Sequence, residues 1–191
     1  MRATEITVQV FEDLDVILNK LNALGFTPTG KCTLNDWYFT HLPTAADIEY
    51  AELMTNSFLV RQVIKDQSQV YLYYKDKEID SAGNVISEEK TSVQLANLTD
   101  SLQIFHKAHL NCWCELKQTL YTFRRGDREF CVQAVAGLGN FIEYEETPAL
   151  QGMTAQQKID AMTAQLKELN LKLGDDWSCK KVYLLYRNRK Q

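Results

Sequence analysis

The sequence predicts an α+β fold in which eight antiparallel strands form a barrel-like tunnel with flanking helices. Two segments that lie about 85 residues apart resemble each other, Glu5–Val10 and Lys90–Leu95, and each leads into an acidic helix start and then another strand. A second observation is the run of alternating strands that begins near residue 57. The spacing of the two copies is too long for a solenoid repeat, so we predict an internal pseudo-duplication that closes a single sheet.

The first copy covers residues 4–39. Residues 4–11 alternate between apolar and polar side chains, which is the period of a half-buried strand. Asp13 is a candidate N-cap for a helix with leucine and isoleucine at helical spacing, and Gly25 ends that helix with a left-handed residue. Cys32–Phe39 is the predicted second strand.

The remaining elements follow from the same periods and from turn residues. Thr99 and Thr154 are the predicted caps of two further helices. We predict one helical turn within 42–55, antiparallel strands at 57–64, 69–76, 86–96, 112–123, 128–135 and 140–146, with turns at 81–84 and 137–139, and a short final strand at 182–186.

Composition limits the classes of function. With 191 residues and 45% hydrophobic content, the chain suits one domain that spans 1–191. Its net charge of −4 argues against nucleic acid or an anionic membrane as a partner. No apolar run approaches the roughly 18 residues that span a bilayer, and no signal-type segment begins the sequence, so we expect the cytoplasm.

Five cysteines, an odd number, are expected to be reduced thiols. His106, His109, Cys112 and Cys114 lie within nine residues and could in principle hold zinc. However, the two histidines fall at the end of a helix and the two cysteines on the following strand. We therefore favour core cysteines and a helix C-terminus over a zinc site.

The segment 130–145, with the sequence FCVQAVAGLGNFIEYE, resembles the hallmark of the CYTH superfamily, the triphosphate tunnel enzymes that include class IV adenylate cyclases and thiamine triphosphatases. The resemblance covers nearly the whole chain, through Leu24-Gly25-Phe26, Asp36–Phe39, Arg61, Lys75, Tyr121 and Tyr183–Leu185. It implies an eight-stranded antiparallel tunnel in which basic residues hold a triphosphate and acidic residues hold Mg²⁺ or Mn²⁺.

The resemblance also implies roles for individual residues, though it assigns no catalytic residue. The phosphate-binding residues it implies are Arg61, Lys75, Lys90 and a displaced Lys117, and the metal ligands it implies are Glu5, Glu143 and Glu145. Each of these side chains could instead point to solvent, as most charged residues on strands do.

Several charges that the superfamily pattern requires are replaced by neutral residues. The opening Glu-x-Glu-x-Lys is here Glu5-Ile6-Thr7-Val8-Gln9, Leu59 replaces the first arginine of Arg-x-Arg, Ser92 and Gln94 replace an acidic pair, and Gln133 replaces an aspartate. Losing one charge-stabilising donor typically costs on the order of 10²–10³ in rate. We therefore expect triphosphate chemistry to be weakened or lost.

Three hypotheses remain open. The first is a protein that binds a phosphate-containing small molecule, either a nucleotide or a polyphosphate. The second is an active metal-dependent triphosphatase or class IV adenylate cyclase, in which Lys117, Arg124, Arg125 and Glu115 refill the lost roles. The third is a structural or interaction module. Independently of these hypotheses, the protein could form a homodimer.

Overall fold

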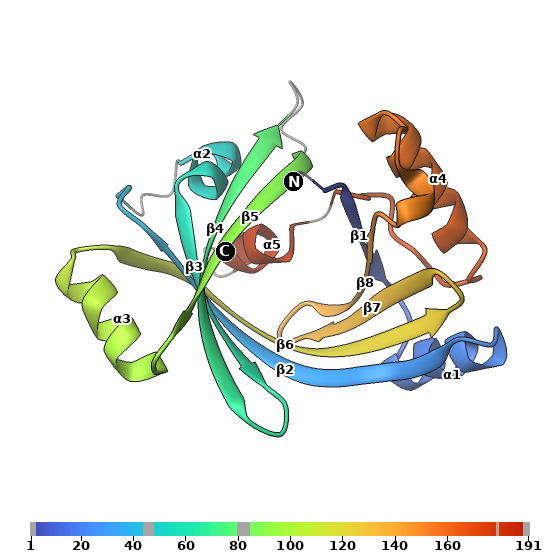
Figure 1. Cartoon of the computed structure of the whole chain (residues 1–191), viewed down its shortest axis with the longest axis horizontal. Coiled ribbons are helices and arrows are strands. Elements are labelled where there is room, and N and C mark those ends of the chain that lie inside the picture. The colour runs from blue at the N-terminus through green and yellow to red at the C-terminus, as the bar shows by residue number, and fades with distance from the viewer. Residues whose placement is uncertain (1–2, 44–47, 80–84, 179, 189–191) are drawn as a thin grey trace. The chain divides into compact units, whose positions relative to one another are not determined.

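The computed structural model describes residues 3–43, 48–79, 85–178 and 180–188, and in these ranges it contains both strands and helices (Figure 1). The strands are β1 (Glu5–Val10), β2 (Thr27–Thr40), β3 (Ser57–Ile64), β4 (Ser68–Ile79), β5 (Val85–Leu95), β6 (Asn111–Arg125), β7 (Arg128–Val135) and β8 (Gly139–Glu145). The helices are α1 (Leu14–Ala23), α2 (Tyr50–Thr55), α3 (Leu98–Lys107), the short 3-10 helix η1 (Pro148–Leu150), α4 (Ala155–Lys167) and α5 (Lys181–Asn188).

The strands are hydrogen-bonded in the order β1-β8-β7-β6-β2-β3-β4-β5, and the register of the paired strands is antiparallel. If β1 to β4 are matched with β5 to β8, this order reads the same from either end. The chain also repeats β1-α1-β2 as β5-α3-β6. The predicted α+β class, the eight antiparallel strands and the internal duplication are therefore confirmed.

The chain divides into two compact units that are interleaved along the sequence. Unit 1 comprises residues 1–2, 32–117 and 181–191, and unit 2 comprises residues 3–31 and 118–180. The long strands β2 and β6 each contribute to both units.

Unit 2 has its core on the face of β1, β8, β7 and β6 that carries the apolar residues. Ile6, Val8 and Val10 alternate with polar residues along β1 and are at most 3% exposed. They pack with Ile17 of α1, Met162 of α4 and residues of the other strands, so both helices cover one face of this part of the sheet. The residues that remain, among them Glu5 and Gln9, belong to the opposite face.

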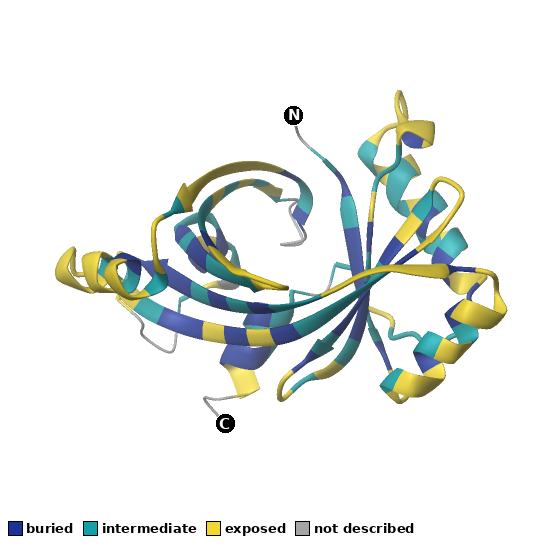
Figure 2. Cartoon of the chain, turned by 60° about the horizontal axis from the view of Figure 1, so that its bottom comes forward, coloured by how far each residue is buried: buried dark blue, intermediate teal, exposed yellow. Residues whose placement is uncertain are grey.

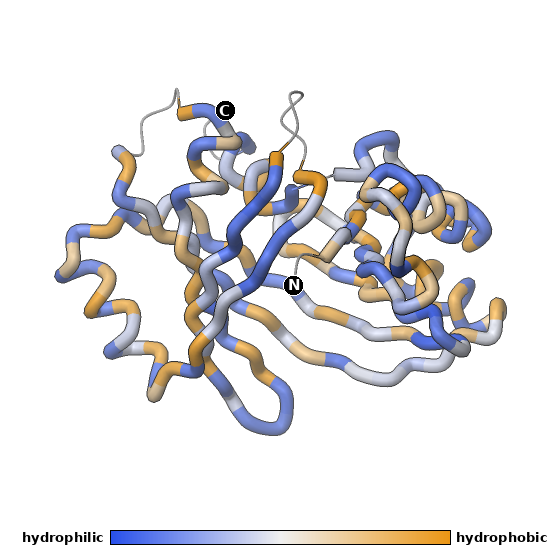
Figure 3. Tube along the Cα trace, turned by 45° about the horizontal axis from the view of Figure 1, so that its top comes forward, coloured by the Kyte–Doolittle hydropathy of each residue, from blue (hydrophilic) through white to orange (hydrophobic). Residues whose placement is uncertain are grey.

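Unit 1 is built in the same way around α3. Phe39, Val60 and Val70 form its buried cluster, and Leu102 and Phe105 of α3 pack against them. Along β4, partly buried and exposed residues alternate from Tyr73 to Ile79, and Figure 2 colours the chain by this burial. In Figure 3 the hydrophilic stretches of β4 and β5 run side by side, in agreement with the pairing of Lys75 with Lys90 and of Lys77 with Glu88.

The outer edge of β1 is covered by the chain that follows α4. Thr7 pairs with Ser178 and Val10 with Leu173 in isolated bridges. The backbone amide of Phe11 donates to the carbonyl of Lys172. Because an uncovered edge strand presents unpaired backbone groups, this segment supplies hydrogen-bond partners to backbone groups along the edge of β1.

Most predicted elements are confirmed, but the prediction of a final strand at 182–186 is wrong. These residues lie in α5, with Val182, Leu185 and Tyr186 buried. Their spacing of three and four residues is helical, and it places all three on one side of the helix. A five-residue apolar run does not by itself distinguish a strand from a buried helix.

Smaller differences concern element boundaries. Helix α3 is capped by Asn97, whose side chain accepts a hydrogen bond from the backbone amide of Asp100, and not by Thr99. The predicted Thr154 cap is confirmed: its hydroxyl accepts a hydrogen bond from the backbone amide of Gln157, and its own backbone amide donates to the Gln157 side chain. Strand β2 begins at Thr27, five residues earlier than predicted. The predicted turn at 81–84 and Ala45 of the predicted helical turn lie outside the described residues.

Among the described residues, no helix combines the length and the apolar character that crossing a bilayer requires.

Candidate functional site

One face of unit 1 gathers charged side chains from four neighbouring strands. Strand register places Asp36 opposite Arg61, Lys75 opposite Lys90, and Lys77 opposite Glu88. Directly opposite residues in a sheet point to the same face, which here is the face away from α3. We call these residues the charged face; its members are Asp36, Arg61, Lys75, Lys77, Glu88 and Lys90.

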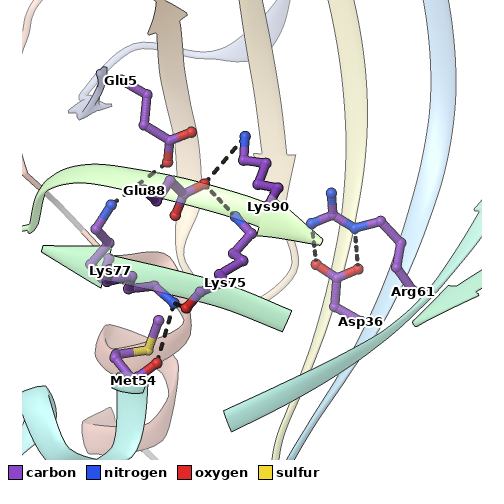
Figure 4. A network of polar contacts seen from close by, with 9 residues as sticks. Glu5, Asp36, Met54, Arg61, Lys75, Lys77, Glu88 and Lys90 are labelled. Carbon is purple, nitrogen blue, oxygen red and sulfur yellow. Dashed lines mark hydrogen bonds and ion pairs between the residues drawn. The ribbon is translucent and has the colours of Figure 1, made fainter. Parts of the chain in front are cut away.

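Arg61 forms a bidentate ion pair with Asp36 (Figure 4). Its Nε and Nη2 atoms each lie 2.7 Å from a carboxylate oxygen of Asp36. The Asp36 side chain is fully buried, whereas that of Arg61 is 24% exposed. The guanidinium therefore neutralises a carboxylate that water does not reach, in the geometry that makes such pairs strong.

Lys75 and Lys90 converge on one carboxylate. Their Nζ atoms lie 2.9 Å and 3.2 Å from the same oxygen, Oε1 of Glu88. Glu88 is almost completely buried, and Figure 4 shows both lysines pointing toward it. Two ammonium groups from adjacent strands are thus already arranged around a single oxygen anion.

Lys77 and two tyrosines border this cluster. The Lys77 ammonium donates to the backbone carbonyl of Met54 at 3.2 Å, which links β4 to α2. Tyr71 and Tyr73 are half-buried on β4, and the Arg61 guanidinium lies 5.7 Å from the centre of the Tyr73 ring. The two tyrosines therefore lie on the same side of the sheet as the charged face.

Tyr38 lies beneath the charged groups. Burial, followed by the nearby Asp36 carboxylate, raises the pKa of its phenol well above the usual value. Its ring packs against Trp113, and Trp113 packs edge-on against Tyr186 of α5. Tyr38 therefore stays neutral and belongs to an aromatic floor, not to the set of cations.

Lys117, the fourth predicted phosphate ligand, differs from the other three. It is exposed on β6, and it makes no hydrogen bond or ion pair with any residue in the described ranges. Arg124 and Arg125, proposed as replacements, lie at the β6–β7 hairpin turn, where they donate to the carbonyls of Gly126 and Leu24. These two arginines are engaged locally in unit 2.

The three predicted metal ligands come together in unit 2. Carboxylate oxygens of Glu5, Glu143 and Glu145 all lie within 4.8 Å of one another. The register explains this: Glu5 is opposite Glu145 in the β1–β8 pair, and Glu143 precedes Glu145 by two residues on the same face. Lys180 lies 3.7 Å from Glu5 and supplies one neighbouring positive charge.

The donor set of this acidic trio fits a hard divalent cation. Mg²⁺ and Mn²⁺ prefer oxygen ligands, and Mg²⁺ is commonly held by one or two carboxylates together with water or phosphate oxygens. Within the described ranges, the trio is the one group of three or more histidine, cysteine or acidic side chains close enough to share an ion. The alternative zinc cluster at His106–Cys114 is therefore not assembled.

Cys131 lies beside the trio. Burial, and then the charges of Glu143 and Glu145, raise the pKa of its thiol to about 11. A thiol with such a pKa is almost entirely protonated at neutral pH and is a poor nucleophile. The cysteines in the described residues are unpaired by disulfides, as predicted, and Cys131 offers no nucleophile for covalent chemistry.

The glutamines at positions where the resemblance implies charged residues are divided between the units. Gln9 and Gln133 both lie opposite Phe141, so they share the face that carries the acidic trio. Gln133 is buried, while Gln9 donates to the carbonyl of Leu138 and lines a pocket of about 510 Å³. Gln94 is exposed and lies opposite Tyr71 in unit 1.

Sequence reasoning missed three members of the charged face: Asp36, Lys77 and Glu88. Asp36 lies in a strand that was recognised through the resemblance, but no role was given to it. The signal that could have revealed the two acids is charge complementarity, because each carboxylate lies directly or diagonally across from a predicted cation.

Comparison with known proteins identifies structures with a similar fold, but it does not establish the function. No protein-family model matches the chain. No curated protein matches it either. Solved structures do match: a protein from Pyrococcus horikoshii OT3 has 18% sequence identity, a TM-score of 0.73 and 99% coverage of each chain.

Two further structures widen the comparison. A protein from Vibrio parahaemolyticus that is provisionally named an adenylate cyclase has 12% identity and a TM-score of 0.66, with 97% of each chain covered. A chain of the Mediator head module from Schizosaccharomyces pombe has 11% identity and a TM-score of 0.55, covering 91% of this chain and 98% of that one. The match shows that this chain shares its fold with a structure that is provisionally named an adenylate cyclase.

Proposed function

We propose that this protein binds a phosphate-containing small molecule, a nucleotide or a polyphosphate, on the charged face of unit 1, with triphosphate chemistry weakened or lost. One observation carries the proposal: Lys75 and Lys90, which lie on adjacent strands, both contact the same carboxylate oxygen of Glu88. Two ammonium groups fixed around one oxygen form a phosphate clamp that needs little rearrangement. Arg61 adds a planar guanidinium, the group best suited to phosphate oxygens.

Lys117 enters this proposal as a peripheral contact, since it is exposed and would have to reorient toward a ligand. Mg²⁺ or Mn²⁺ enters as a cation held by the acidic trio. When bound, such an ion would supply positive charge among these three carboxylates. Thiols that form no disulfide favour a reducing compartment, so we propose the cytoplasm as the location. The net charge of −4 does not favour nucleic acid or a membrane as a partner.

Thermal unfolding in the presence of orthophosphate, AMP, ATP and tripolyphosphate tests the proposal. A ligand at 100 times its Kd stabilises by about 2.7 kcal/mol, which for a chain of this length raises Tm by roughly 5–10 °C. We expect such a shift for at least one phosphate compound and no shift for chloride at the same ionic strength. If none of the four compounds raises Tm, the proposal fails.

The alternative function is an active metal-dependent triphosphatase or class IV adenylate cyclase, and the assembled acidic trio favours it. Release of phosphate or diphosphate from ATP and tripolyphosphate, measured with Mg²⁺ and with Mn²⁺, separates the two functions. The binding proposal predicts turnover close to that of buffer alone. Sustained turnover that disappears on addition of EDTA would instead establish the enzyme.

Replacement of one trio carboxylate gives a prediction for the metal. The variant Glu143→Gln is expected to weaken Mn²⁺ binding about tenfold or more, because the affinity of such sites depends on the number of ligand charges. The Mn²⁺-dependent rise in Tm, titrated for each variant, measures this change.

The matched control is Glu168→Gln, which removes a carboxylate that is 61% exposed in the same unit. It should leave the Mn²⁺ titration unchanged. An equal loss of Mn²⁺ affinity in both variants would mean that the ion responds to overall charge and that the trio is not its site.

A further inference from the structure

We propose that unit 2 contains a second binding site, which accepts a small organic ammonium ion that carries an aromatic or aliphatic group. The site is the pocket of about 510 Å³ that Gln9 lines, at the point where the turn from β1 to α1 meets the turn from β7 to β8. None of the described residues that line this pocket belongs to the charged face or to the acidic trio. The proposal therefore holds or fails independently of phosphate binding.

The size and the construction of the pocket suit a small molecule. Ligand pockets commonly enclose about 300–1,000 Å³ and combine apolar walls with a few polar groups. All the residues that line this one lie in unit 2. The backbone amide of Phe11 donates to the carbonyl of Lys172, and that of Gly174 donates to the carbonyl of Gln9. The segment after α4 is thereby fastened to β1 beside the pocket.

Two side-chain amides supply hydrogen-bond acceptors to the wall of the pocket. Nε2 of Gln9 donates to the carbonyl of Leu138 at 3.0 Å, and Nδ2 of Asn140 donates to the carbonyl of Glu12 at 2.9 Å. Because a flip of either amide would bring two oxygens together, its orientation is set. Neither amide oxygen accepts a hydrogen bond from any residue in the described ranges. The pocket therefore suits a ligand that donates hydrogen bonds.

Asp13 adds a negative charge to these acceptors. It is the exposed N-cap residue of α1, but its side chain makes no capping hydrogen bond, and it forms no ion pair within the part of the chain that the structure describes. The neighbouring Glu12 differs, because its side chain is 7% exposed and lies 2.6 Å from the Lys20 ammonium. Of these two carboxylates, that of Asp13 is therefore the one available to the ammonium group of a ligand.

Phe11 and Val16 supply the apolar part of the wall. Phe11 is 62% exposed and Val16 is 42% exposed. A Cβ added at Gly174 would lie 3.4 Å from Cε2 of Phe11, so the ring lies close to the backbone of this glycine. An aromatic ring beside a carboxylate attracts organic cations through its quadrupole and also covers their apolar groups. These features together define the class of ligand.

Lys172 is the one cation among the described residues that line the pocket, and it opposes a cationic ligand. Its exposed ammonium makes no hydrogen bond or ion pair in the described ranges, so it can move into water on its long stem. For an anionic ligand, Lys172 would instead be the principal contact. Replacing Asp13 and replacing Lys172 must therefore change ligand affinity in opposite directions, and the sign of each change identifies the charge of the ligand.

The experiment compares three probes that share a phenyl ring and a two-carbon chain: phenethylamine, 2-phenylethanol and 3-phenylpropionate. Their Kd values are measured from the chemical shifts of backbone amides, at neutral pH and constant ionic strength. For the unaltered protein we expect phenethylamine to bind about tenfold or more tightly than 3-phenylpropionate, with 2-phenylethanol between them. The largest shifts should occur in residues 9–16 and 138–140.

Three variants assign the contacts. Asp13→Asn should weaken phenethylamine binding about threefold, the size typical of one exposed ion pair, and Lys172→Gln should strengthen it about twofold. Phe11→Ala should weaken all three probes about threefold or more, because each of them packs on the ring. The matched control is Asp127→Asn, which makes the same exchange at an exposed aspartate of unit 2 outside the pocket and should leave every Kd unchanged.

The proposal is overturned if 3-phenylpropionate binds as tightly as phenethylamine, or if Asp13→Asn and Asp127→Asn have equal effects. It also fails if none of the three probes shifts the signals of the residues that line the pocket. The comparison of the probes needs no variant, so the test stands even if a variant does not fold. Because no phosphate compound is used, its outcome is separate from that of the proposed function.

Discussion

Replacing Arg61 with methionine is expected to lower the free energy of unfolding by about 3–5 kcal/mol, because it leaves the buried Asp36 carboxylate without its bidentate partner. For a chain of this length, that loss corresponds to a fall in Tm of roughly 6–20 °C. Chemical denaturation of the variant, followed by circular dichroism, measures the change. A loss this large is comparable to the total stability of many domains.

Two comparisons isolate the origin of the effect. The double variant Arg61→Met with Asp36→Leu should recover most of the stability, since replacing both members of a buried pair with apolar groups is often neutral. Arg128→Met breaks the pair with Glu168, which is 61% exposed, and should cost no more than about 1 kcal/mol. Equal losses for Arg61→Met and Arg128→Met would show that the burial of Asp36 is energetically unimportant.

Trp113→Ala is the second replacement with a large expected effect, about 3–5 kcal/mol of unfolding free energy. The Trp113 indole is 6% exposed, its Nε1 donates to the hydroxyl of Ser57 at 3.0 Å, and its ring packs against Tyr38 and Tyr186. The replacement removes one wall of the site that holds α5. Chemical denaturation should reveal the loss of stability. In the variant, amide hydrogen exchange should accelerate more in residues 181–188 than in α3.

Phe11→Ala serves as the control for Trp113→Ala, since it also truncates an aromatic side chain, but one that is 62% exposed. Its cost should stay within about 0.5 kcal/mol. If Trp113→Ala is equally mild, or if it leaves exchange in α5 unchanged, then Trp113 does not anchor the C-terminal helix.

The strands and the duplication could be predicted from the sequence because alternation is a local property. In residues 5–10 and 128–135, the alternation of side chains along the sequence indicates a strand before any partner strand is known. The final helix could not be predicted in this way. Val182, Leu185 and Tyr186 are buried at helical spacing, but the run is short enough to resemble a strand, and a local pattern does not reveal the long-range packing of Tyr186 against Trp113.

The candidate site was predictable in part. The resemblance named Glu5, Glu143 and Glu145, and strand register brings their carboxylates together. The counter-charges of Arg61 and of the two lysines were not predicted, because pairing across strands depends on a register that a single sequence does not specify. Asp36 and Glu88 therefore became visible as partners only when the strands were aligned.

The interleaving of the two units has a consequence for biosynthesis. Because α5 belongs to unit 1 and residues 118–180 belong to unit 2, unit 2 lacks part of itself until residue 180 has left the ribosome, and unit 1 until α5 has followed. Strand pairing between distant residues, such as Glu5 with Glu145, adds a large loop-closure cost to the folding barrier. Folding should thus be slow, and a fragment cut near residue 96 should acquire neither core.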